Sequence, residues 1–107
     1  MRVFDSYRPG KRQMNMGLFW EYNTADFDFE KNKRLVVTRV IMLGRLNDWY
    51  AAFDIYGGIP AFRKIARDEV VGLDDRDLDF MCRSLHLKKE ETQCYIRKQL
   101  RLKHLNS

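Results

Sequence analysis

The sequence predicts an all-α fold, a compact bundle of about five short helices behind a flexible basic N-terminal arm. Three observations predict it. Apolar residues recur at helical spacings of three and four along most of the chain. Residues that favour helix starts and stops separate these stretches. A chain of 107 residues, 45% of them hydrophobic, can bury one core but is too small for a two-domain enzyme with an interdomain cleft.

The first sixteen residues show no apolar period. They combine Pro9 and Gly10 with a basic, polar composition, so we expect a mobile arm over residues 1–16 and a single helical domain over residues 17–107. The aromatic run from Leu18 to Tyr22 is too short for a stable helix. We expect it to form a short extended segment that lies on the core.

The first predicted helix runs from about Asp28 to Leu43. Asp28 offers an N-cap oxygen, and apolar residues such as Val36 and Val40 then recur at helical spacing. Gly44 is expected to end this helix in a left-handed conformation.

The next two predicted helices flank a glycine pair. Asn47 can cap the second helix, which Gly57 and Gly58 stop. Pro60 suits the first turn of the third helix, where its missing N–H has no helical partner, and a break follows at residues 70–72. The expected apolar positions are Leu46, Trp49, Tyr50, Phe53 and Tyr56 in the second helix, and Phe62, Ile65 and Ala66 in the third.

Asp74 is the strongest N-cap candidate in the chain. Leu73 before it and Leu78 after it can close a hydrophobic staple, and the fourth helix follows. A fifth helix is expected to begin near Lys89. The expected inward residues are Leu78, Met81 and Leu85 in the fourth helix, and Tyr95 or Ile96, Leu100 and Leu102 in the fifth.

Motifs of catalysis are absent from the sequence. It has no phosphate-binding glycine loop, no nucleophile elbow and no zinc-protease motif. Ser84 and His86 are two residues apart on a predicted helix and so point to different faces. We predict no catalytic residues and a protein that is not an enzyme.

A metal site has only weak support. Cys82 and His86 are four residues apart, but Cys94 and His104 are ten apart, which does not match the usual zinc spacings. We expect free thiols in a reducing compartment and neither a metal nor a cofactor. A small zinc-dependent domain stays open as an alternative.

The apolar stretches bear on the cellular location. No window approaches the roughly 20 apolar residues of a membrane span, and no apolar signal core follows the first residues. We therefore expect a cytoplasmic protein that does not contact a membrane.

The end of the chain carries the strongest cationic feature. No acid follows Glu91, and Gln93, Arg97, Arg101 and His104 fall on one predicted helix face. Together with the fourth helix this gives a helix-turn-helix-like outline, which favours binding to duplex DNA. The alternative is an ordinary solvated basic face. The predicted nucleic-acid-binding residues are Gln93, Arg97, Lys98, Arg101 and Lys103.

Exposed aromatic residues are the expected anchors for a protein partner. Trp20 and Tyr22 are the candidates because Trp and Tyr are common hot-spot residues in interfaces. The alternative is that the aromatic residues, Trp49 among them, fill the core of a small domain.

Four short motifs resemble a family of small bacterial domains of unknown function. They are Leu18-Phe19-Trp20-Glu21, Asp48-Trp49, Tyr56-Gly57 and Cys94-Tyr95. Glu21 replaces the family's usual Asp, and residues 96–107 extend beyond the family's usual end. Members are often encoded beside a nucleotidyltransferase-like toxin, so the resemblance implies an antitoxin-like role with that toxin and operator DNA as partners.

These observations favour a non-enzymatic binding module, antitoxin-like or regulatory, with DNA binding through a basic C-terminal helix. The alternative is a protein-interaction domain without nucleic-acid affinity. The oligomeric state stays open.

Overall fold

The computed structural model describes residues 4–105. This part of the chain is helical and contains no strand. The predicted all-α fold of about five helices is confirmed. The α-helices are α1 (Lys33–Leu43), α2 (Leu46–Tyr56), α3 (Ile59–Asp68), α4 (Asp75–Leu85) and α5 (Gln93–Leu105), and the 3-10 turns are η1 (Met16–Phe19), η2 (Thr24–Asp26) and η3 (Lys89–Glu91).

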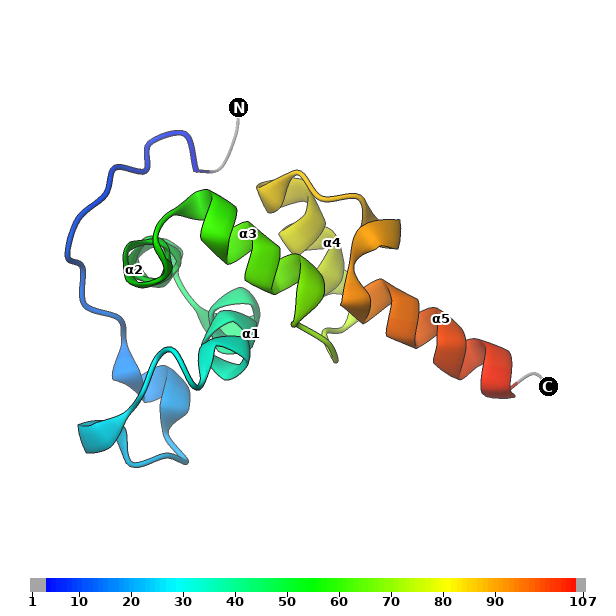
Figure 1. The fold of residues 1–107 in the computed structure, drawn as a ribbon, viewed down its shortest axis with the longest axis horizontal. Helices are drawn as coiled ribbons and strands as arrows, with labels where there is room; N and C mark the ends of the chain where they lie inside the picture. Colours follow the sequence, from blue (N-terminus) through cyan, green and yellow to red (C-terminus); the bar gives the residue numbers. More distant parts are fainter. Residues whose placement is uncertain (1–3, 106–107) are drawn as a thin grey trace.

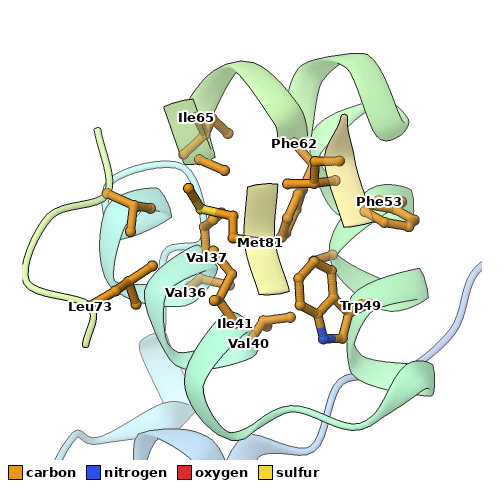
Figure 2. Close-up of a cluster of buried hydrophobic side chains, with 14 of the residues drawn as sticks. Val36, Val37, Val40, Ile41, Trp49, Phe53, Phe62, Ile65, Leu73 and Met81 are labelled. Carbon is orange, nitrogen blue, oxygen red and sulfur yellow. The ribbon is translucent and has the colours of Figure 1, made fainter. Parts of the chain in front are cut away.

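The core lies where α1, α2, α3 and α4 meet, and α5 extends from this body (Figure 1). Figure 2 shows apolar side chains from all four helices and from the loop before α4 converging on one centre. Aromatic rings interlock there: the Phe53 and Phe62 rings meet edge to face with centroids 5.0 Å apart. The labelled core residues are Val36, Val37, Val40, Ile41, Trp49, Phe53, Phe62, Ile65, Leu73 and Met81.

The N-terminal segment differs from the mobile arm that we expected. Residues 4–16 curve around one side of α2 (Figure 1), and Phe4 and Met14 are buried. Phe4 packs against Trp49 and Phe53 of α2, with centroids 5.0 Å away in both cases. The apolar residues of this segment are too few to show a period in the sequence, but the rings of Phe4 and Tyr7 both pack against aromatic residues of α2. Residues 1–3 of the expected arm lie outside the described residues.

Two local predictions before α1 were wrong. The run from Leu18 to Tyr22 is not extended, because its first residues belong to η1, where Leu18 and Phe19 are buried. The first α-helix begins at Lys33 rather than at Asp28. Asp28 does accept hydrogen bonds from the backbone N–H groups of Glu30 and Lys31, but these close a turn that precedes the helix.

Gly44 ends α1 for a reason that differs from the predicted one. Its backbone is extended, with φ −73° and ψ 152°, and not left-handed. A Cβ atom at this position would lie 2.7 Å from the carbonyl oxygen of Val40, so glycine is needed for close approach. Gly57, in contrast, is left-handed at φ 95° and ends α2 as predicted.

The start of α2 is held by an acid and not by Asn47. Asp48 accepts hydrogen bonds from the backbone N–H groups of Arg45, at 2.9 Å, and of Asn15, at 3.0 Å. Its buried carboxylate therefore satisfies the first turn of the helix and fixes the end of the N-terminal segment. Asn47 instead donates to the carbonyl oxygen of Gln13.

In the second half of the chain, the structure agrees more closely with the predictions from the sequence. The Asp74 carboxylate accepts a hydrogen bond of 2.8 Å from the N–H of Asp77, so the predicted N-cap of α4 is confirmed. Leu78, Met81 and Leu85 are buried as expected. In the part of the chain that the structure describes, no helix is both long and apolar enough to span a bilayer.

Candidate functional site

The second half of α5 is an exposed helical surface that carries several cations. Figure 1 shows its last turns extending beyond the four-helix body. Its first turn is anchored, since Cys94 is buried and Tyr95 packs against the core. The prediction that Leu100 and Leu102 contact the core was wrong: they are 53% and 51% exposed, because no other helix within residues 4–105 reaches that far.

The predicted nucleic-acid-binding residues share this helix but differ in their surroundings. Arg97, Arg101 and Lys103 are exposed and form no ion pair within residues 4–105. Lys98 is half-buried and its ammonium lies 3.5 Å from a carboxylate oxygen of Asp75 on α4. Gln93 is half-buried at the helix start. The cationic surface that faces solvent is therefore carried by the three exposed residues.

A groove separates α5 from the start of α4. It has a volume of about 560 Å³ and opens to solvent. The sequence did not reveal it, because the two walls come from residues about twenty positions apart. Its lining residues are Asp75, Leu78, Asp79, Lys89, Tyr95, Lys98, Gln99, Arg101 and Leu102.

The turn between α4 and α5 is fixed by Arg63 of α3. Its guanidinium donates hydrogen bonds of 2.9 Å to the carbonyl oxygens of Leu85 and His86. His86 has a left-handed backbone, with φ 57°, and these bonds satisfy the carbonyls that the helix end leaves free. Arg63 is thus part of the scaffold that sets the direction of α5. Neighbouring Arg67 pairs with Asp68.

Trp20 and Tyr22, which precede α1 in the sequence, form a second exposed surface. Trp20 is 70% exposed and its ring lies 4.9 Å from the guanidinium carbon of Arg39. Arg39 donates to the carbonyl oxygen of Leu18 at 2.8 Å and forms an ion pair with Glu21. These contacts hold the indole in place at the surface. The other tryptophan, at position 49, belongs to the core with 4% exposure.

The cysteines carry no metal-binding geometry. Both are free and buried, and burial raises the pKa of the Cys82 thiol. The Cys94 thiol donates a weak hydrogen bond to the carbonyl oxygen of Leu73 at 3.8 Å. Among the described residues, no group of three or more His, Cys, Asp and Glu side chains could hold a metal ion.

Ser84 and His86 both line one cavity of about 140 Å³, together with Phe4, Asp5 and two other apolar residues. The buried Ser84 hydroxyl has no hydrogen-bond partner in the described part of the chain, so it donates no hydrogen bond to His86 there.

The model of a family of unknown function (DUF6922) matches residues 14–66 of this chain. This part contains η1 to α3 with the exposed Trp20, and it ends before the groove and before α5. No curated protein and no solved structure shows significant similarity to the chain.

Proposed function

We propose that this protein is a non-enzymatic binding module of antitoxin-like or regulatory type that binds duplex DNA through α5. The observation that carries the proposal is the set of exposed cations Arg97, Arg101 and Lys103, which have no ion-pair partner among residues 4–105. The helix itself contains no acidic residue. Cations of this kind bind phosphates and release the counterions that surround DNA.

The position of α5 supports this use. A helix that extends from the body can approach a groove or a phosphate backbone without a clash from the other helices. Arg63 fixes the turn before it, so the helix is presented in a set direction. We place the protein in the cytoplasm, where the buried thiols of Cys82 and Cys94 would remain reduced.

The test measures DNA binding as a function of salt. A labelled 20-base-pair duplex is titrated with the wild type and with the double variant Arg97→Ala/Arg101→Ala at several salt concentrations. We expect weaker binding for the variant and a salt slope that falls by about 2, about one for each lost phosphate contact. The matched control, Lys31→Ala/Arg34→Ala, removes two exposed charges at the start of α1 and keeps the wild-type slope.

A protein partner is the second candidate function. Leu100 and Leu102 favour it, because half-exposed leucines gain nothing from a phosphate backbone but become buried in a protein interface. The Trp20 surface favours it as well. The family resemblance implies a nucleotidyltransferase-like toxin as that partner.

Co-expression with the product of the adjacent gene tests the second candidate. We expect the two proteins to purify as a complex that survives high salt, and Trp20→Ala to reduce the yield of the complex. A complex that forms with the wild type and with the Arg97→Ala/Arg101→Ala variant alike would favour the protein partner over DNA. Failure of both proteins to associate would leave DNA binding as the candidate.

A further inference from the structure

We propose that the groove between α4 and α5 binds an acidic, amphipathic helical segment of a partner protein. The inference concerns the face of α5 that points toward α4, whereas Arg97 and Lys103 lie outside the lining of the groove. Arg101 belongs both to the lining and to the proposed DNA-binding residues, so the two proposals share this residue and are separated by the probe that each test uses.

The size and shape of the groove suit a peptide segment. About 560 Å³ is enough for several side chains, and the groove opens to solvent. Leu78 belongs to the wall of the groove but is buried at 1% exposure, Tyr95 is partly buried, and Leu102 is 51% exposed. Tyr95 and Leu102 therefore offer the apolar contact to side chains spaced one helical turn apart.

The charged residues of the groove determine which sign of charge a bound peptide should carry. Asp75 is paired with Lys98, and Asp79 is paired with Lys89 at 2.5 Å, so both acids of the lining are already compensated. Arg101 is the cation of the lining that forms no ion pair within residues 4–105. An occupant with carboxylates is therefore attracted, and a basic one is repelled.

A peptide fits these features better than a nucleic acid does. DNA binding would use the cations and leave the apolar edge at Leu102 in water. A helical segment with an apolar stripe and an acidic flank would bury Leu102 and pair with Arg101 at once. The occupant we infer thus has leucine-like residues at helical spacing, with Asp or Glu beside them.

The probe is a fluorescein-labelled 16-residue peptide with leucines at positions i, i+3, i+4 and i+7 and glutamates on its remaining faces. Binding to the full chain is followed by fluorescence anisotropy. We expect saturable binding to the wild type and at least tenfold weaker binding to Leu102→Ser and to Arg101→Gln. The matched control is Leu46→Ser, because Leu46 is also 51% exposed but lies at the start of α2.

Three results would overturn the inference. One is the absence of saturable binding of the acidic peptide to the wild type. Another is equal binding of a peptide in which lysine replaces every glutamate. The third is wild-type affinity in both Leu102→Ser and Arg101→Gln, with far-UV circular dichroism showing that the variants are folded. The DNA titration of the preceding section uses neither peptide, so either proposal can fail alone.

Discussion

The hydroxyl of Tyr7 donates a hydrogen bond of 2.7 Å to Oδ1 of Asp54, which lies 47 residues further along the chain. The same carboxylate accepts hydrogen bonds from the backbone N–H groups of Gly10 and Arg12, at 3.0 and 3.2 Å. It also forms an ion pair of 3.0 Å with the Arg12 guanidinium, and its side chain is only 5% exposed. One carboxylate thus fixes the N-terminal segment to α2.

Replacing Asp54 by Asn should detach this segment in part. The variant keeps the shape of the side chain but loses its charge. Its NH₂ group also replaces one of the two oxygens that accept the hydrogen bonds of the segment. We expect the free energy of unfolding to fall by about 1–3 kcal/mol in a urea titration. Asp68→Asn is the control, because Asp68 is exposed and its carboxylate pairs with the adjacent Arg67. Equal losses in both variants would show that Asp54 has no special role.

The pKa of Asp54 also predicts how the stability of the fold changes at acidic pH. Burial raises the pKa of Asp54, but hydrogen bonds from Tyr7, Arg12 and Gly10 outweigh it and leave the pKa below its usual value of 3.8. The folded state therefore binds this proton less readily than the unfolded state, and the stabilisation is lost as the pH falls below about 4. We expect the difference in unfolding free energy between the wild type and Asp54→Asn to shrink over that range. A constant difference would contradict the assignment.

The pKa of Tyr7 predicts a loss of stability at alkaline pH. Burial and the neighbouring Asp54 raise its pKa from 10.0 to about 12. The folded state then holds the phenol proton more tightly, so the stabilisation is present below pH 10 and is lost as the pH rises toward 12. Tyr7→Phe should therefore lose less stability than the wild type between these two values. Thermal unfolding followed by circular dichroism at several alkaline pH values measures this.

The two tryptophans should respond differently to truncation. Trp49→Ala removes a buried ring and should cost about 3–5 kcal/mol of unfolding free energy. Trp20→Ala loses an exposed ring above Arg39 and should cost about 0.5–1 kcal/mol. In single-tryptophan variants made with Phe, acrylamide should quench Trp20 more strongly than Trp49. Similar quenching would place both rings in similar surroundings.

Gly44→Ala should destabilise the fold although its backbone angles suit any residue. The added methyl group would lie 2.7 Å from the Val40 carbonyl oxygen, which belongs to the helix backbone and cannot move away. We expect a loss of about 1–3 kcal/mol in a urea titration. Gly10→Ala is a comparison that should cost less, because its new methyl group would first meet the Arg12 guanidinium at 3.1 Å, and a side chain shifts more easily than helix backbone. A neutral Gly44→Ala variant would contradict the close approach.

The sequence predicts the helices whose ends carry local signals. Asp74 caps α4, Gly57 ends α2 and Pro60 lies in the first turn of α3, each as expected. In these places the residue that makes the signal satisfies neighbouring backbone groups, so a short window of sequence contains the whole interaction.

Predictions failed where the partner is distant in the sequence. Asp54 and Asp48 hold residues 7–15, but nothing near Tyr7 or Asn15 reveals those partners. The same holds for Leu102, whose spacing fits a core position although no helix covers it. Tertiary neighbours decided these cases, and periodicity alone contains no information about them.

The sequence predicted the cations of the candidate site but not the groove beside them. The cations of α5 are visible in the sequence, and three of them are exposed. The groove beside them depends on Asp75 and Leu78 from another helix, and on the turn after α4 that Arg63 binds. Such an arrangement appears only when α4 and α5 are placed in space.

The clasp between Tyr7 and Asp54 also sets an order of events during translation. Residues 4–13 are synthesised before α2, but their binding surface does not exist until α2 has emerged and coiled. After Tyr7 is added, more than forty further peptide bonds must be made before its partner Asp54 exists. A nascent chain that ends before Asp54 should therefore leave residues 4–13 open to a protease, and one that extends well past α3 should not.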